Sequence, residues 1–318
     1  AGVAAANPMA VEAGLKVLAA GGSAADAAVA VQAMLGLVEP QSSGIGGGGF
    51  LLLDDGKGKL ESYDGRETAP AAAGPNWFEL NGQFLSVPQA IPGGLSVGVP
   101  GNVARMAEAH RKYGRLPWKR LFEPAIRLAG DGFAVTPRFQ NFLERFRPTP
   151  LPGADPYWAA RGVAMSPESR AIYYAPDGSP LPVGATVRNP ALAAFLDRLA
   201  KEGARAFYAG ANATALAHTV SAAPRNPAPM RVSDIAGYKA RKREPICTTY
   251  RRWRLCGMGP PSSGAIVVSG VLGMLERFDL AALGKDSPVS WHLIAEAQRL
   301  AYADRERYLA DPDFTPVP

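Results

Sequence analysis

Long uncharged apolar runs are missing from this sequence of 318 residues. The nearest approach is the alanine-rich stretch 24–38, but it contains Asp26 and Gln32, and a membrane-spanning helix needs about 20 consecutive, predominantly apolar residues. The opening residues AGVAAANPMA also lack the basic start and leucine-rich centre of a signal peptide, and no initiating methionine is present. We therefore expect no membrane span and a chain that has already been processed, with export left open.

Histidine is rare in this sequence, and the G-x-S-x-G motif that is typical of serine hydrolases is absent. His110, His218 and His292 are the only histidines. Each falls in a predicted helix without the carboxylate or cysteine spacing of a metal site, so we interpret all three as surface or packing residues and expect no metal and no cofactor. No G-x-S-x-G sequence occurs, so the nucleophile of a Ser/His/Asp hydrolase has no signal here.

Cysteine occurs twice, at Cys247 and Cys256. If Arg251 and Arg252 form a two-residue hairpin loop, the two cysteines lie opposite each other at a non-hydrogen-bonded position, where Cα atoms are about 4.5 Å apart, within the range of a disulfide. Two buried free thiols are the alternative, because both central residues of a type I′ loop need positive φ and arginine suits that poorly. A disulfide would indicate an oxidising compartment such as a periplasm.

Basic residues outnumber acidic ones, 34 to 28, which gives a net charge of +6. This excess weakly favours acidic small molecules or anionic surfaces as partners. Lys239, Arg241, Lys242 and Arg243 form the first of two dense basic stretches. The alternation there is typical of a β-strand, and no nucleic-acid reader motif accompanies it. We interpret the stretch as a solvated strand face and expect no nucleic-acid partner.

The remaining patterns predict a chain of mixed helices and strands. With 47% hydrophobic residues, no internal repeat and no low-complexity linker, we expect one compact domain over residues 1–318. Asn7-Pro8 and the pair Ser23 and Asp26 are good helix starts. We predict helices at 8–20, 23–38, 101–113, 116–130, 190–201, 204–208, 211–222 and 287–309, strands at 2–6, 50–53, 60–64, 238–247 and 253–258, and irregular chain over 70–100 and 148–190.

Two features around residues 43–67 could belong to a site. Gly44, Gly46 and Gly49 match G-x-G-x-x-G, but a dinucleotide fold needs a strand before that motif and a helix after it, and the order here is reversed. We interpret the glycines as a passage free of side chains, where another segment or a partner chain comes close. Arg66 follows a predicted strand, and its guanidinium can bind a carboxylate through two parallel hydrogen bonds. On position alone, an ordinary salt bridge is the better interpretation.

Several segments together resemble the γ-glutamyltransferase family of the N-terminal-nucleophile hydrolases. They occur in family order from near residue 1 to the last few residues. The matching segments are GGSAADAAVA (21–30), PQ with GGGGF (40–50), GRETAP (65–70), VPG (99–101), YG (113–114), AGDGF (129–133), PPSSG (260–264), AYADR (301–305) and DPDF (311–314).

The resemblance implies half of a two-chain enzyme. In this family a precursor cuts itself, and the new N-terminal threonine of the smaller chain becomes the nucleophile with its own α-amino group as base. This chain begins with Ala1 and has no Thr-Thr-His segment, so we expect it to hold no catalytic residue and to have the small subunit of the same precursor as its partner. The implied fold is α/β (α+β), the large-subunit half of a four-layer αββα sandwich, and the implied location is periplasmic or secreted.

By the same resemblance, Arg66 matches the arginine that pairs with the α-carboxylate of a γ-glutamyl group. The implied reaction is acyl transfer from glutathione, glutamine and related γ-glutamyl compounds, through a γ-glutamyl ester on the threonine, to water or to an amino acid or peptide acceptor. Arg66 would fix the donor so that its γ-carbonyl reaches the nucleophile.

Two departures and two alternatives accompany this hypothesis. The chain stops at Pro318, where the family's large chain usually continues to the cleavage point, and the cysteine pair is not a general family feature. A related acylase acting on cephalosporin or glutaryl amides would use the same arginine. An inactive binding or scaffold subunit, whose partner has lost its threonine, is the alternative from another class of protein.

Overall fold

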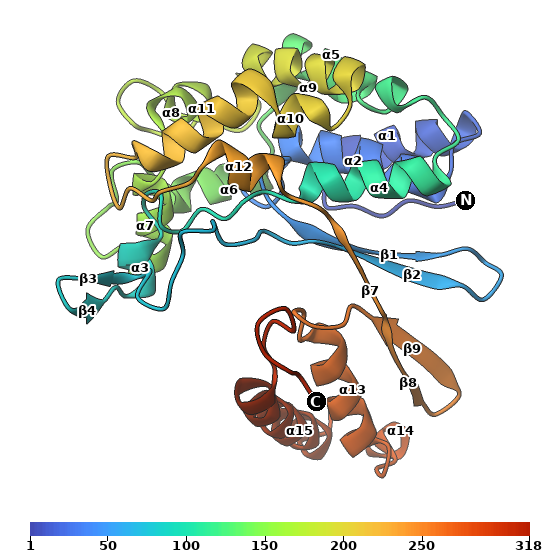
Figure 1. Ribbon diagram of the computed structural model, residues 1–318. Helices are drawn as coiled ribbons and strands as arrows, with labels where there is room; N and C mark the ends of the chain where they lie inside the picture. Colours follow the sequence, from blue (N-terminus) through green and yellow to red (C-terminus); the bar gives the residue numbers. More distant parts are fainter. The chain divides into compact units, whose positions relative to one another are not determined.

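The computed structural model describes residues 1–318, which divide into two compact units (Figure 1). Unit 1 comprises Ala1–Gly49 and Gly65–Ala240, and unit 2 comprises Phe50–Asp64 and Arg241–Pro318. Unit 1 is mainly helical, whereas unit 2 combines strands with a pair of longer helices. One compact domain over residues 1–318 stays a prediction.

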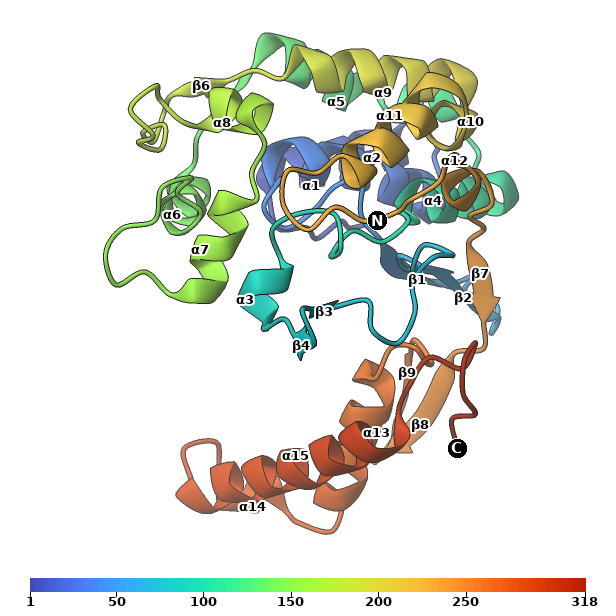
Figure 2. The same ribbon diagram turned by 60° about the vertical axis from the view of Figure 1, so that its left-hand side comes forward.

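The core of unit 1 is built around α2 (Ala24–Val38), which contacts α1 (Pro8–Ala19), α4 (Asn102–Tyr113) and α5 (Glu123–Asp131). Alanine lines much of α2, and Ala30 and Ala33 are each only 1% exposed. Small side chains let neighbouring helices approach closely. Figure 2 shows α5 and α9 (Pro190–Glu202) side by side in the same unit.

The starts of α1 and α2 follow the predicted capping chemistry. The Asn7 side chain accepts a hydrogen bond from the Met9 N–H. Ser23 and Asp26 form a capping box, in which each side chain accepts a hydrogen bond from the other residue's backbone N–H. The predictions of helices at 8–20 and 23–38 are therefore confirmed.

Other elements of unit 1 are confirmed in part. The helix predicted at 101–113 is α4, and the segment 116–130 contains a 3₁₀ turn (Trp118–Leu121) followed by α5. The helices predicted at 190–201, 204–208 and 211–222 are α9, α10 (Arg205–Tyr208) and α11 (Gly210–Ser221). No strand forms at 2–6. Short elements elsewhere are α3 (Val87–Ala90), α12 (Val232–Ala236), and the strands β3 (Glu79–Leu80), β4 (Gln83–Phe84), β5 (Phe133–Ala134) and β6 (Thr186–Val187).

The segment predicted as irregular over 148–190 contains two helices, so that prediction is wrong. They are α7 (Pro156–Val163) and α8 (Pro167–Tyr173), and α6 (Pro137–Arg145) precedes them without having been predicted. All three begin with proline after a capping residue, which is Thr136, Asp155 or Ser166. Proline is favoured at the first helical position because that N–H has no intrahelical partner.

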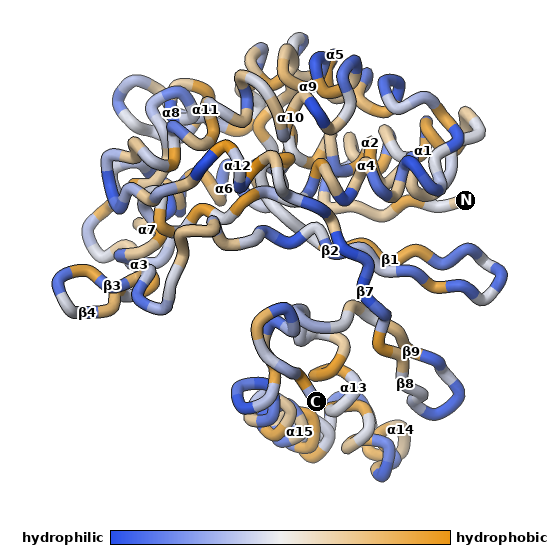
Figure 3. Tube along the Cα trace, viewed as in Figure 1, coloured by the Kyte–Doolittle hydropathy of each residue, from blue (hydrophilic) through white to orange (hydrophobic).

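The first sheet of unit 2 has the strand order β1-β2-β7. The strands are β1 (Gly49–Asp54), β2 (Leu60–Gly65) and β7 (Arg241–Arg243), and β2 pairs with β7 in antiparallel fashion. Figure 3 shows β1 as a hydrophobic segment that ends in a hydrophilic turn. The predicted strands at 50–53 and 60–64 are confirmed. The strand predicted over 238–247 is divided, because Pro245 has no N–H for a ladder.

The basic stretch on β7 is neutralised within unit 2. Arg243 contacts Asp64 at 3.0 Å and Asp313 at 2.8 Å, and Arg241 contacts Asp313 at 2.7 Å. Lys242 lies 3.4 Å from Glu61. The basic side chains of β7 are therefore paired with carboxylates of the same unit.

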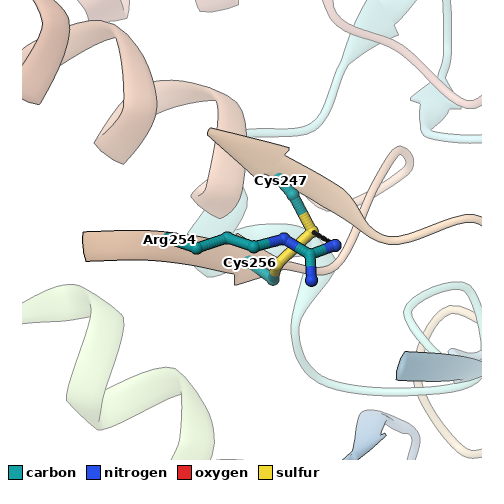
Figure 4. Close-up of a disulfide and its surroundings, with 3 residues drawn as sticks. All are labelled: Cys247, Arg254 and Cys256. Atoms are coloured by element: carbon teal, nitrogen blue, oxygen red, sulfur yellow. Dashed lines mark hydrogen bonds between the residues drawn. A yellow bond between two sulfur atoms is a disulfide. The ribbon is translucent and has the colours of Figure 1, made fainter. Parts of the chain in front are cut away.

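The cysteine hairpin of unit 2 consists of β8 (Ile246–Tyr250) and β9 (Trp253–Gly257). Cys247 lies opposite Cys256, as predicted, with Cα atoms 4.1 Å apart and Sγ atoms at bonding distance, 2.09 Å (Figure 4). Of the two loop residues, Arg251 has positive φ and Arg252 does not. The loop therefore differs from type I′, which relieves the conflict with an Arg-Arg sequence.

The helices of unit 2 are α13 (Gly264–Leu275), α14 (Leu280–Leu283) and α15 (Pro288–Tyr308). The predicted helix at 287–309 corresponds to α15, whereas α13 was not predicted. α13 packs against α15 and against β8. None of the helices in residues 1–318 has both the length and the apolar character that crossing a bilayer requires.

Candidate functional site

The glycine-rich run lies against the loop that carries Arg66, within unit 1. No glycine between positions 44 and 49 has positive φ, so backbone conformation does not explain them. A Cβ added at Gly48 would lie 2.5 Å from Glu67 Oε2 and 2.7 Å from the Gly65 carbonyl oxygen. The expected close approach of another segment is therefore confirmed, and that segment is 65–67.

The amino end of α4 holds the middle of the glycine run. The Gly101 and Asn102 N–H groups both donate to the Gly47 carbonyl oxygen, at 3.1 and 3.0 Å. The Asn102 side-chain amide donates to the Gly44 carbonyl oxygen at 2.6 Å. The backbone N–H groups of Gly101 and Asn102 are among those that a helix start leaves without intrahelical partners. The sequence analysis did not single out Asn102, although it lies in the first turn of the helix predicted at 101–113, next to the VPG segment.

A buried carboxylate, Glu39, anchors the start of the same run. Its side chain is 2% exposed and accepts hydrogen bonds from the Asn7 amide at 3.3 Å, the Gln41 amide at 2.6 Å and Arg138 Nε at 3.2 Å. A buried carboxylate persists when it is paired and hydrogen-bonded. Glu39 therefore ties the amino end of α1 to the chain entering the glycine run.

Arg66 lies directly after β2, and its guanidinium faces solvent. The side chain is 59% exposed, and Nη1 lies 3.3 Å from Glu67 Oε2, whose side chain is 30% exposed. An exposed ion pair contributes only about 0–1 kcal/mol, so a carboxylate ligand can replace Glu67 at low cost. The ordinary salt bridge that the sequence analysis favoured is present, between Arg66 and Glu67, and it leaves the Arg66 guanidinium accessible to solvent.

The backbone around Arg66 is held by surrounding segments. Thr68 and Val99 exchange backbone hydrogen bonds of 3.2 and 2.8 Å. The Ala71 N–H donates to Asp234 Oδ1 at 3.4 Å, and the Tyr238 hydroxyl donates to the Arg66 carbonyl oxygen at 2.7 Å. An exposed charged side chain thus stands on a fixed loop.

A second arginine, Arg105, is buried behind this loop. The residue is 8% exposed, and Nη2 donates to Asn102 Oδ1 at 2.8 Å. Burial lowers the pKa of the Arg105 guanidinium, because desolvation disfavours the charged form. A Cβ added at Gly65 would lie 2.5 Å from Arg105 Cβ. Arg105 adds positive charge close to the Arg66 loop and favours an anionic ligand there.

The GGSAADAAVA segment and the two residues that follow YG meet at the fully buried carboxylate of Asp26. Asp26 Oδ2 accepts from the backbone N–H groups of Ser23, Arg115 and Leu116 at 2.8, 2.9 and 3.2 Å. His110 Nε2 lies 2.9 Å from the Leu116 carbonyl oxygen and 3.5 Å from Asp26 Oδ1. This histidine packs within the scaffold. No group of three or more His, Cys, Asp or Glu in residues 1–318 could hold a metal ion.

The sequence model of the gamma-glutamyltranspeptidase family matches residues 10–318. The chain belongs to the gamma-glutamyltranspeptidase family. It is 36% identical over 316 residues to the glutathione hydrolase proenzyme of Escherichia coli (strain K12), which covers 99% of this chain and 52% of that protein. It is 34% identical over 318 residues to the acylase ACY 1 proenzyme of Pseudomonas sp. (strain V22), which covers 98% of this chain and 54% of that protein.

The structural comparison agrees with this assignment. The crystal structure of Helicobacter pylori gamma-glutamyltranspeptidase matches with a TM-score of 0.90 and 33% identity, over 100% of this chain and 86% of that one. The predicted mixed helix and sheet fold of this family is therefore confirmed. The chain spans about half the length of the curated relatives it matches.

Proposed function

We propose that this chain is the large subunit of a γ-glutamyltransferase. It acts with a small subunit from the same precursor, whose N-terminal threonine carries the γ-glutamyl ester. Donors are glutathione, glutamine and related γ-glutamyl compounds, and acceptors are water, amino acids or peptides. The observation that carries the proposal is Arg66, an accessible guanidinium on a fixed loop in a chain of this family.

Arg66 would bind the donor's α-carboxylate through two parallel hydrogen bonds and take the place of Glu67 in its ion pair. The threonine Oγ attacks the γ-carbonyl carbon, its proton passes to the threonine α-amino group and then to the departing amine, and the C–N bond breaks. Water or an acceptor amine next attacks the ester carbonyl, which releases the threonine. The contribution of Arg66 is proximity, because a bound carboxylate fixes the distance to the γ-carbonyl.

The test is Arg66→Ala in the two-chain enzyme, with γ-glutamyl-p-nitroanilide as donor. We expect kcat/KM to fall by about 10- to 100-fold, since hydrogen bonds to charged groups contribute about 1.5–3 kcal/mol. The matched substrate is 4-aminobutanoyl-p-nitroanilide, which lacks the α-carboxylate and should lose little. Equal losses on both donors, or no loss on either, would contradict the role of Arg66.

A glutaryl or cephalosporin acylase is the second candidate, favoured by the 34% identity to an acylase proenzyme. Arg66 could bind a glutaryl carboxylate in the same way. Glutaryl-p-nitroanilide lacks the amino group of the γ-glutamyl donor, so the ratio of kcat/KM for the two anilides separates the candidates. Mass spectrometry of the protein made from the full precursor tests the inactive-subunit alternative, because activity requires a second chain that begins with threonine.

We further propose that Cys247 and Cys256 are oxidised and that the protein is periplasmic or secreted. The support is the position of Cys247 opposite Cys256 across the β8–β9 hairpin, with Cα atoms 4.1 Å apart, and the restriction of stable disulfides to oxidising compartments. Alkylation of the unfolded, unreduced protein from its native compartment should label neither cysteine. Labelling of both cysteines would contradict the proposal.

A further inference from the structure

Two stacked tyrosines lie beside the Arg66 loop in unit 1. Tyr238 follows α12, and its hydroxyl donates to the Arg66 carbonyl oxygen at 2.7 Å. Its ring stacks on that of Tyr208, with centroids 5.8 Å apart and planes 9° from parallel. Tyr208 ends α10 and is 9% exposed. The ring of Tyr238 is thus held by a buried aromatic neighbour, which limits where its hydroxyl can lie.

Tyr208 is itself tied to the segment that holds the glycine run. Its hydroxyl donates to the Pro100 carbonyl oxygen at 2.9 Å and accepts from the Ala104 N–H at 3.1 Å. A tyrosine hydroxyl keeps its proton at neutral pH and can donate, and burial raises the pKa of Tyr208 further. The stack therefore connects Arg66 to the amino end of α4.

Gly101 gives an independent sign that the Tyr238 hydroxyl has a restricted position. A Cβ added at Gly101 would collide with both the Tyr238 hydroxyl and the Gly65 carbonyl oxygen. The φ of Gly101 is −115°, which any residue can adopt, so the absence of a side chain serves close packing. The glycine leaves room for the hydroxyl next to the residue that precedes Arg66.

We propose that Tyr238 is a positioning residue for Arg66. Its hydrogen bond orients the peptide plane between Arg66 and Glu67, and thereby the two side chains that pair with each other. Tyr238 does not touch the donor. Without its hydroxyl, the guanidinium would sample more orientations, and the donor's carboxylate would have to restore the productive one at a cost in affinity. This inference rests on the carboxylate-binding role of Arg66.

The test is Tyr238→Phe in the two-chain enzyme, which removes the hydroxyl and keeps the stacked ring. We expect KM for γ-glutamyl-p-nitroanilide to rise about 3- to 10-fold, the range of one lost hydrogen bond, with kcat changed less than about twofold. The constant for 4-aminobutanoyl-p-nitroanilide, measured as KM or as an inhibition constant, should stay the same. A general structural defect would move both donors together, and that result would overturn the proposal.

Tyr174→Phe is the matched control, because the Tyr174 hydroxyl also donates to backbone carbonyls, those of Leu143 and Phe146 at 2.9 and 2.8 Å. It should leave both constants unchanged. Gly101→Ala presses on both the Tyr238 hydroxyl and the Gly65 carbonyl oxygen, and it should raise KM for the carboxylate donor at least as much as Tyr238→Phe does. If it does not, the proposal is wrong even where Tyr238→Phe folds poorly.

Arg66→Ala, measured in parallel, separates the two hypotheses. If it leaves the preference for the carboxylate donor intact, the proposed function of Arg66 fails, and the role of Tyr238 fails with it. If Arg66→Ala abolishes that preference while Tyr238→Phe leaves KM unchanged, only the positioning role is overturned.

Discussion

Two helices of similar composition have opposite environments in this chain. In α2 of unit 1, nine residues are buried, whereas in α13 of unit 2 the single buried residue is Leu275. Both are apolar around most of their circumference, which is typical of helices covered on several sides. Neighbours from unit 1 cover α2. Unit 2 leaves Val268 of α13 53% exposed and Trp291 of α15 61% exposed.

Unit 1 therefore buries its apolar helix α2 within itself, whereas unit 2 leaves apolar side chains of α13 and α15 exposed. A contiguous exposed apolar surface is typical of an interaction site. The small subunit proposed above would supply this cover. Arg66 and its supporting contacts lie in the unit that is already packed.

The largest effect should come from breaking the scaffold of unit 1 at Asp26. Asp26→Ala removes a fully buried carboxylate and leaves the part-buried N–H groups of Ser23, Arg115 and Leu116 without their acceptor. We expect the free energy of unfolding to fall by about 3–5 kcal/mol. Urea denaturation of the two-chain protein measures this loss. Asp177→Ala, which removes an exposed carboxylate that accepts from Ser179, should change stability little. Equal stability of the two variants would show that the Asp26 contacts are dispensable.

Val268→Asp on α13 tests the cover of unit 2 directly. If the small subunit buries this face, a carboxylate there should cost about 3 kcal/mol or more in the two-chain protein, seen as a lower melting temperature or as dissociation. Val183→Asp in unit 1 is the matched control, because Val183 is also 53% exposed. Equal melting temperatures for the two variants would show that α13 faces solvent in the assembled protein.

Gly48→Ala tests the close packing of the site. The new methyl group would press on Glu67 and Gly65, and we expect a loss of about 1–3 kcal/mol together with a higher KM for the γ-glutamyl donor. At Gly46, nothing lies within 4 Å of an added Cβ. Gly46→Ala should therefore keep both stability and KM. A Gly48 variant as active as the Gly46 variant would mean that the loop yields easily.

The smallest effect should come from Asp313 in unit 2. The hydrogen bond from Arg243 holds the pKa of Asp313 below its usual value. A carboxyl group with a lowered pKa in the folded state stabilises the protein above its unfolded pKa, near 4, and loses this contribution as pH falls through the folded value. Asp313→Asn should cost about 1 kcal/mol or less at pH 7, and this cost should shrink as pH falls through the folded pKa of Asp313. A cost independent of pH would indicate lost packing instead of lost charge pairing.

Local rules predicted much of the fold. The caps at Asn7 and Ser23 and the register of Cys247 with Cys256 depend on residues close in sequence. The same rules could have found α7 and α8, since Asp155-Pro156 and Ser166-Pro167 carry the start signal that correctly placed α15 at Ser287-Pro288. The density of proline there was interpreted as loop, although proline at a first helical position favours a helix.

The site itself was only partly predictable. Arg66 was selected by its place in an ordered series of segments, because an arginine after a strand carries little information alone. Asn102, Arg105 and Tyr238 had no such signal. Asn102 and Tyr238 act through hydrogen bonds to backbone distant in sequence, at Gly44 and Arg66, and Arg105 packs closely against Gly65.

By itself, the sequence determined the helix starts at Asn7 and Ser23, the hairpin register, the family and the residue proposed to bind a carboxylate. Only the tertiary structure decided that the glycine run, residues 65–67, the amino end of α4 and Tyr238 meet. The hydrogen bond from Tyr238 to Arg66 spans 172 residues. Such pairs leave no periodicity or capping pattern in the chain, because packing of whole elements brings them together.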